Sequence, residues 1–447
     1  MRTAFREFLT TREDRFKPKD KSILSLQRIN KIDFSGRIYL SDKSSNTDMI
    51  LIKKGDLVIS GINVEKGALS VYEGNDDITA TIHYSSYSFD SKKIEIDYLK
   101  WFLKSQVFTR LVKEQVPGGI KTEIKPKHLL PLEIDLPDLE EQRDIVKRFL
   151  NTEKEYSELS HELSHQQSLL KKLRQAILQE AVQGKLVPQD PNDEPASELL
   201  KRIKVEKEKL IAEGDIRKEK LLPPIKDEEI PFELPKSWVW CRLGEIVSIL
   251  GDGLHGTPQY SKDGEYYFIN GNNLINGTIE LKDNTKRVSV IEYEKYKKEM
   301  STNTVLVSIN GTLGNLAYFQ NEKIILGKSA CYFNLLEGVD KYYLGYLIKS
   351  NYFSKYAIEE ASETTIKNVS LGSMRRLPIP LPPFSEQHHI VEKINSLISN
   401  SDQLEKQIDE NAKHSELLLQ AVLKEAFEPK TVYKTPEPAY RMVAEKK

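Results

Sequence analysis

The residues in this sequence that most resemble a chemical site are two histidines in the pattern of zinc proteases. His161 and His165 flank Glu162 in an HExxH motif, in which the histidines would bind Zn²⁺ and the glutamate would act as general base. However, Leu159 and Leu163 belong to an apolar heptad pattern that continues straight through the motif, so His161 points away from the apolar seam. A third ligand would need the chain to fold back. The sequence therefore predicts two exposed helical histidines.

Other catalytic motifs fail in the same way. Gly327-Lys328-Ser329 matches the end of a phosphate-binding loop, but Glu322 stands where the earlier glycine is required. The dinucleotide motif GxGxxG is absent, and so is the Asn/Asp-Pro-Pro-Tyr/Phe tetrapeptide with which adenine methyltransferases hold a flipped base. His388 and His389 lie at a helix start without a cluster of ligands. We expect no catalytic site, no metal and no cofactor bound by this chain.

Composition narrows the class of protein. The 447 residues are enough for two or three domains, and no run of apolar residues is long enough to span a membrane. The charged N-terminus does not read as a signal peptide, and the two cysteines are far apart, so we expect a cytoplasmic protein without membrane partners. The net charge of −1 neither supports nor excludes DNA binding, which would have to use local patches.

A long internal repeat organises the chain. The segment beginning at Glu141 recurs 245 positions later at Glu386, and blocks beginning at Tyr98 and Gln175 recur at the same offset. A looser match joins residues 55–60 to residues 303–308 at an offset of 248. The repeat predicts two halves, each with a divergent globular part and a helical part of fixed length.

The helical part has the 3.5-residue period of a coiled coil. A helix of about 40–45 residues would be roughly 60–70 Å long and would need a partner, for which its own repeat is the obvious candidate. Antiparallel pairing would place one globular module at each end. The predicted seam consists of Ile145, Phe149, Leu159, Leu163, Leu170, Leu173 and Ile177 in the first copy, and Ile390, Ile394, Leu397, Leu404, Ile408, Leu418 and Val422 in the second.

These patterns predict an α+β fold with an internal pseudo-two-fold repeat. We expect a first module at residues 1–137 and a second module at residues 231–383, both of mixed α/β character. Two helical spacers would occupy residues 138–230 and 384–428, followed by a C-terminal tail at 429–447. The first spacer would include a highly charged helix and a linker, and we expect that helix to be solvated, with a docking surface as the alternative.

Candidate DNA-contacting residues lie in Gly- and Asn-rich turns and in basic loops. Asn side chains can pair with adenine edges, and Lys side chains with guanine or phosphate. The alternatives are ordinary hairpin turns and solvated charge runs. The candidates are Ser60, Asn63, Lys66, Lys121, Lys125 and Lys127 in the first module, and His255, Thr257, Asn270, Asn272, Asn273, Asn310, Thr312 and Lys367 in the second.

The repeated block resembles a known family. The pairing of IDLPDLEEQRDIV (134–146) with IPLPPFSEQHHIV (379–391) closely resembles the hallmark of specificity subunits of type I restriction-modification systems. The stretches LPKSWVWCRLGEI (234–246) and GDGLHGTP (251–258) are similar to the opening of their target recognition domains. The resemblance extends from about residue 50 to 428. The first module has no clear LPxxW opening and is similar to a different recognition subtype.

The resemblance implies a function without catalysis. Each target recognition domain would read one half of a split target in double-stranded DNA, and the two helices would set the gap between the halves. Two methylation subunits would bind the helices and use S-adenosylmethionine, and restriction (motor-nuclease) subunits would use ATP and Mg²⁺. The alternative is a coiled-coil scaffold whose two modules bind protein partners.

Overall fold

The computed structural model describes residues 2–427 except 13, 44, 64–65, 116–122 and 363–365. The predicted tail and the candidate Lys121 lie outside these residues. The chain forms two compact units, the first made of Met1–Ser164 with Asp409–Lys447 and the second of His165–Ile408. Each unit thus contains one module together with part of each long helix.

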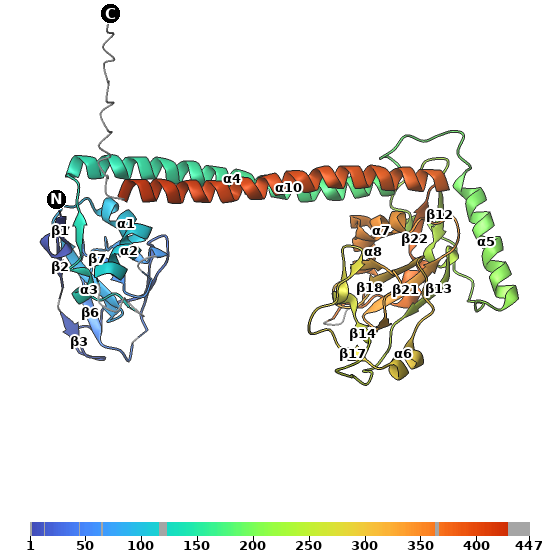
Figure 1. Ribbon diagram of the computed structural model, residues 1–447, viewed down its shortest axis with the longest axis horizontal. Coiled ribbons are helices and arrows are strands. Elements are labelled where there is room, and N and C mark those ends of the chain that lie inside the picture. Colours follow the sequence, from blue (N-terminus) through green and yellow to red (C-terminus); the bar gives the residue numbers. More distant parts are fainter. Residues whose placement is uncertain are drawn as a thin grey trace, which may run out of the picture. The chain divides into compact units, whose positions relative to one another are not determined.

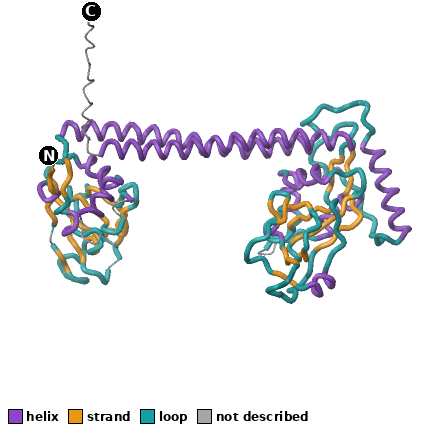
Figure 2. The backbone as a smooth tube through the Cα atoms, in the orientation of Figure 1, coloured by secondary structure: helices purple, strands orange, loops and turns teal. Residues whose placement is uncertain are grey.

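Two helices of identical length follow the repeat. Helix α4 (Leu139–Val182) and helix α10 (Phe384–Phe427) both have 44 residues, and both ends of α10 lie 245 positions after those of α4 (Figure 1). In Figure 2 this helical pair carries no strand, and all strands belong to the modules. The predicted length and register of the helical part are confirmed.

Contacts within each unit show that the two helices run antiparallel. In the first unit, Phe427 at the end of α10 packs against Phe149 near the start of α4, with ring centroids 5.2 Å apart. In the second unit, Arg174 near the end of α4 bonds to Asp402 and Glu405 in the first half of α10, at 2.6 and 2.9 Å. Late residues of one helix therefore meet early residues of the other in both units.

The helical seam differs in part from the strict heptad prediction. Leu159, Leu173, Leu404 and Leu418 are 42–63% exposed. Residues one position later, Arg174, Glu405 and Leu419, are half-buried instead. A straight α-helix has 3.6 residues per turn and drifts away from a 3.5-residue repeat. The other predicted seam residues are buried or half-buried: Ile145, Phe149, Leu163, Leu170, Ile177, Ile390, Ile394, Leu397, Ile408 and Val422.

In its described residues, the first module contains three sheets and three short α-helices. A two-stranded sheet pairs β1 (Arg2–Ala4) with β11 (Glu133–Asp135). A four-stranded sheet has the order β2 (Leu9–Thr11), β10 (Tyr84–Phe89), β7 (Leu57–Ser60), β8 (Leu69–Val71). A five-stranded sheet has the order β3 (Arg15–Phe16), β6 (Met49–Ile52), β9 (Ile78–Thr81), β4 (Arg28–Ile32), β5 (Ile38–Ser41). The helices are α1 (Ile96–Lys104), α2 (Gln106–Gln115) and α3 (Pro126–Leu129).

The second module repeats two of these sheets. Strand β12 (Val239–Arg242) pairs with β22 (Pro378–Leu381). A four-stranded sheet has the order β13 (Val247–Asp252), β21 (Ala330–Leu335), β18 (Thr304–Ser308), β19 (Leu316–Tyr318). The remaining strands are β14 (Tyr266–Ile269), β15 (Leu274–Ile275), β16 (Thr278–Ile279), β17 (Arg287–Val288) and β20 (Ile324–Leu326). The helices are α6 (Val290–Tyr296), α7 (Lys341–Lys349), α8 (Asn351–Glu359) and α9 (Leu371–Arg376).

A buried glutamine anchors each long helix to its module in the same way. Gln142 accepts a hydrogen bond from the backbone N–H of Glu95 at 2.7 Å and donates to the carbonyls of Lys93 and Pro137. Gln387 makes the equivalent three bonds, with Asp340, Gly338 and Pro382, each 245 positions later. Both side chains are completely buried. This network explains why the Glu-Gln block recurs.

The charged helix after α4 is part of the second module, unlike the solvated helix expected from its composition. Helix α5 (Ala196–Glu213) buries Ala196, Leu199, Leu200 and Ile203 in the core of that module. The Lys207 ammonium donates to the carbonyls of Gly244 and Val247, and its burial lowers the pKa of Lys207. Helix α5 is therefore fixed to the module on its inner face.

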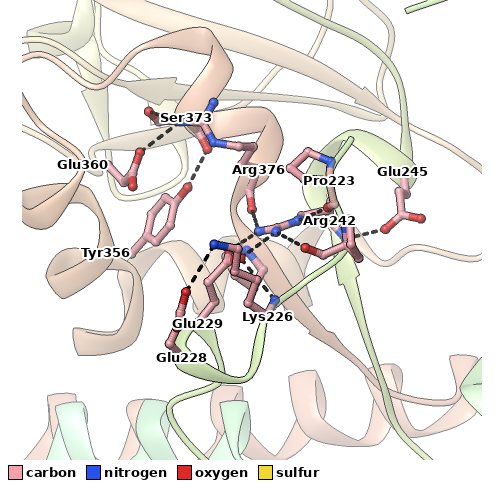
Figure 3. Close-up of polar contacts among 12 residues, drawn as sticks. Pro223, Lys226, Glu228, Glu229, Arg242, Glu245, Tyr356, Glu360, Ser373 and Arg376 are labelled. Atoms are coloured by element: carbon pink, nitrogen blue, oxygen red, sulfur yellow. Dashed lines mark hydrogen bonds and ion pairs between the residues drawn. The ribbon is translucent and has the colours of Figure 1, made fainter. Parts of the chain in front are cut away.

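A buried arginine holds the following linker on the same module (Figure 3). The Arg242 guanidinium is 3% exposed and forms two bonds to the Glu229 carboxylate. It also donates to the carbonyls of Pro223, Pro224 and Arg376. The linker is thus clamped to β12, where a buried charge is matched by a carboxylate and three backbone acceptors.

Candidate nucleic-acid interface

The candidate residues of the second module lie on loops that follow strands of two sheets. His255 and Thr257 follow β13, Asn270 follows β14, and Asn310 and Thr312 follow β18. Backbone bonds join these loops: Leu254 N–H donates to the Leu326 carbonyl at 2.7 Å, and Gly311 N–H donates to the Lys367 carbonyl at 3.0 Å. The structure thus brings residues from four separate parts of the sequence to one end of the module.

Ser329 connects the loops at the centre of this region. Its hydroxyl donates to the Asn270 side-chain oxygen at 3.1 Å and accepts from the Gly271 N–H at 2.8 Å. Its carbonyl accepts from the N–H groups of Ile309 and Asn310. The Asn310 amide in turn donates to Asn368 at 3.2 Å. The amide side chains are therefore held by neighbours, which pre-organises them for contact with a ligand.

Two hollows lie on either side of this connection. The first, of about 360 Å³, is lined by Asp252, His255, Ile309, Asn310, Lys328, Asn368, Val369, Ser370 and Leu371. The second, of about 330 Å³, is lined by Tyr260, Phe268, Asn270, Asn272, Asn273, Lys282, Asn284, Thr285 and Lys286. Amides, lysines and aromatic rings are the groups that contact base edges, phosphates and sugars.

Lys328 and Asn368 are candidate residues that the sequence did not reveal. Lys328 is exposed at the rim of the first hollow, in the Gly-Lys-Ser stretch that fails as a phosphate-binding loop. Its place there depends on the bond from its own N–H to the Leu254 carbonyl, which joins loops more than 70 residues apart. In the sequence, the only hint of Lys328 was a lysine next to a glycine, because the spacing of the phosphate-binding motif is not met.

Some of the candidate DNA-contacting residues are buried, and one of them stabilises its own turn. Asn273 is 8% exposed; its oxygen accepts from the Asn270 N–H and its amide donates to the Glu280 carbonyl. Ser60 is 6% exposed at the end of β7. Asn272, Thr257, Thr312, Lys367, Lys66 and Lys127 are exposed.

The first module builds an equivalent site from different side chains. The Ile124 N–H donates to the Gly61 carbonyl at 2.8 Å, and the Val369 N–H donates to the Ile309 carbonyl at the same distance. In the first module this contact brings Glu123 beside His83, with Lys125 3.7 Å from the Glu123 carboxylate. The repeat places Asn368 where Glu123 stands. Asn63, half-buried, and Lys66 lie in the turn after β7 nearby in sequence.

The enzyme-like motifs lie elsewhere and do not converge. His161 and His165 are both exposed on α4, and His388 pairs with Asp340 at 3.1 Å at the start of α10. Among the described residues, no group of three His, Cys, Asp or Glu side chains is placed to bind a metal. In that same part of the chain, no helix combines the length and hydropathy needed to cross a membrane.

Comparison with known proteins shows what the second module is similar to. Residues 235–414 match the type I restriction modification DNA specificity domain. The chain is 38% identical over 263 residues to the type I restriction enzyme EcoAI specificity subunit of Escherichia coli, covering 57% of this chain and 44% of that protein. It is 32% identical over 266 residues to the EcoEI specificity subunit of the same organism, with the same coverage. The matched region spans less than half the length of these curated relatives.

Solved structures show the same fold. The HsdS subunit from Thermoanaerobacter tengcongensis superposes with a TM-score of 0.56 at 16% identity, covering 96% of both chains. A chain from a structure described as the basis of complex assembly and conformational transition of the type I R-M system gives 0.57 at 15% identity, covering 96% of this chain and 97% of that one. The second module is thus similar to a type I restriction modification DNA specificity domain. The chain is similar to type I restriction enzyme specificity subunits over part of its length, and it shares its fold with the HsdS subunit.

Proposed function

We propose that this chain reads a bipartite, asymmetric DNA target and directs the other subunits of a type I restriction-modification complex to it. The observation that carries the proposal is a repeated scaffold whose loop sites differ. Glu123 and Asn368 occupy equivalent positions beside equivalent backbone bonds, yet one is a carboxylate and the other an amide. Carboxylates accept from cytosine, whereas amides pair with adenine, so the two modules would read different half-sites.

Within the second module, exposure and bonding divide the roles. Lys328 and Lys367 are exposed at the loop site and would bind phosphate oxygens, which fixes the position of the module on the duplex. Asn272 is exposed and Asn270 lies beside it, so their amides would meet base edges. Asn273 would only support the turn, because both ends of its amide are already bonded.

The partners of the complex supply the chemistry. Two methylation subunits would bind the helical pair, use S-adenosylmethionine and take the target adenine out of the stack. Restriction subunits would join them and use ATP and Mg²⁺ in the cytoplasm. This chain would contribute the DNA address and bind none of these cofactors.

Methylation mapping after a module exchange tests the division of labour. In cells carrying the complete system, the native chain should direct methylation to one split motif. Replacing residues 231–383 with another such module should change one half of that motif and leave the other. A change in both halves, or the absence of any split motif, would contradict the proposal.

The salt dependence of binding separates DNA reading from a protein scaffold. DNA binding by the chain with its methylation subunits should weaken steeply as salt rises. Lys328→Ala should reduce the slope of log K against log salt by about 1, as expected for one lost phosphate contact. Lys201→Ala is the matched control, because Lys201 is exposed on α5 and paired with Glu198. Salt-insensitive binding, or equal slopes for both variants, would favour the scaffold.

A further inference from the structure

A groove opens on the first module beside the end of the last helix. Its volume is about 360 Å³. Apolar side chains of α1 and α2 form its floor, among them Tyr98 and Val107, and Glu141 of α4 stands on its wall. Ala426 and Phe427, the last two residues of α10, complete the wall. The chain that follows Phe427 therefore begins at the edge of the groove.

The equivalent position in the second module is covered by the chain that follows α4. There Glu386, the repeat of Glu141, is 2% exposed and accepts bonds from the Trp238 indole at 2.9 Å and the Gln189 amide at 2.6 Å. Leu186 and Val187 pack on the same cluster of buried residues. Phe232 packs edge-to-face against Tyr352, the repeat of Val107, with ring centroids 5.7 Å apart. In one module the position is thus filled, and in the other it is a groove.

The repeat identifies which segment would fill the groove. Residues 183–195 follow α4 as residues 428–440 follow α10, again 245 positions later. Val432 then matches Val187, and Lys434 matches Gln189, the residue that bonds to Glu386. The charges also fit, because four acidic and two basic residues line the groove, whereas residues 428–447 contain five basic and three acidic residues.

We propose that residues 428–447 bind in this groove, with Val432 against its apolar floor and Lys434 paired with Glu141. The segment lies outside the described part of the chain. Residues 428–447 would then cover this position of the first module, as residues 183–238 cover the equivalent position of the second. This contact is independent of whether the module reads DNA.

Photo-cross-linking of the full-length chain tests the contact. A benzoylphenylalanine replaces Arg110, which lines the groove, and mass spectrometry identifies the residue to which it links. Phe34, which is 56% exposed on the same module, is the control position. Links from position 110 to residues 428–447 are expected, and none from position 34. Mixing ¹⁵N-labelled and unlabelled chains distinguishes links within one chain from links between two copies.

Charge exchange gives a second, independent measurement. Lys434→Glu and Glu141→Lys should each abolish the cross-link, and the double variant should restore it. Lys446→Glu changes the charge of the same segment by the same amount and should leave the link intact. The proposal is overturned if position 110 links only to a second copy, links to no part of residues 428–447, or links equally in all variants.

Discussion

The two modules are anchored to the long helices in the same way, but they differ in the segments that pack on their outer surface. Gln142 and Gln387 make the same three bonds with residues 245 positions apart. Strands β1 and β11 pair in the first module as β12 and β22 do in the second, so that Ala4 stands where Arg242 does. The common parts fix the module on its helix, and the divergent parts are free to vary.

The second module carries an outer layer that has no counterpart among the described residues of the first. Helix α5, the linker clamped by Arg242, and Trp238 on Glu386 together cover its outside. The register of β1 with β11 aligns Arg2 with Trp240, so no described residue of the first module corresponds to Trp238. The two modules should therefore respond differently to substitutions at equivalent positions.

The largest effect is expected at the arginine that clamps the linker. Arg242→Ala removes the donor of three carbonyls and the main partner of the partly exposed Glu229 carboxylate, and losing several hydrogen bonds to one buried cation should cost about 3 kcal/mol. Native-state hydrogen exchange should show this loss in the second unit and none in the first. Arg202→Ala is the control: its pair with Glu194 is exposed and screened by solvent, so its loss should cost much less than the loss of Arg242. Equal losses of protection for the two variants would show that Arg242 stabilises the second unit no more than an exposed arginine does.

A smaller effect, equal in both halves, is expected at the anchoring glutamines. Gln142→Ala and Gln387→Ala each leave a buried N–H and two carbonyls without a partner, which costs about 2 kcal/mol. Each variant should lower protection in its own unit by the same amount. Gln403→Ala, at an exposed position of α10, should change it by less than about 0.5 kcal/mol. Unequal losses of protection for the two variants would mean that the equivalent hydrogen bonds stabilise the two units to different extents.

The two glutamates that precede the anchors should behave unequally. Glu386→Ala leaves the Trp238 indole without an acceptor and removes one of the two acceptors of the Gln189 amide, so it should cost about 1–2 kcal/mol in the second unit. Glu141→Ala, at the groove, should cost less than Glu386→Ala, because the Glu141 side chain is only half-buried. Burial raises the pKa of Glu386, although its hydrogen bonds act in the opposite direction. The stability that protonated Glu386 contributes is therefore fully present below the ordinary glutamate pKa, and it is lost as pH rises through the raised pKa. A Glu386→Gln chain should lack this pH dependence.

The sequence predicted the parts of the molecule that depend on period and register. The offset of 245 placed both long helices, because an uninterrupted helix converts sequence separation directly into length. The charged composition of α5 concealed its apolar stripe at Ala196, Leu199, Leu200 and Ile203, although these residues have the i, i+3, i+4, i+7 spacing of a buried face. Composition averaged over all faces of the helix hides a single buried face.

The loop site could be predicted by residue type but not by arrangement. Asn270 and Asn310 lie in the same region because both contact Ser329. Asn273 turned inward and Lys328 came to the rim through contacts between loops distant in sequence. A single sequence does not specify which loops meet, since that depends on strand order in the sheet.

The smallest effect is expected at a turn that is ionic in one module and neutral in the other. Asp56 accepts bonds from Arg12, Ser86 and the Lys53 N–H, whereas Thr304, at the matching turn, bonds to Asn334 and the Ser301 N–H. Burial alone would raise the pKa of Asp56, but these hydrogen bonds hold it below the ordinary aspartate value. Asp56 therefore contributes stability above the ordinary aspartate pKa, and this contribution is lost as pH falls through the lowered value. In an acid titration followed by hydrogen exchange, wild type and Asp56→Asn should differ at neutral pH and converge in acid, in the first unit only. A constant difference across the titration would show that the ionic form of Asp56 adds nothing that an amide does not.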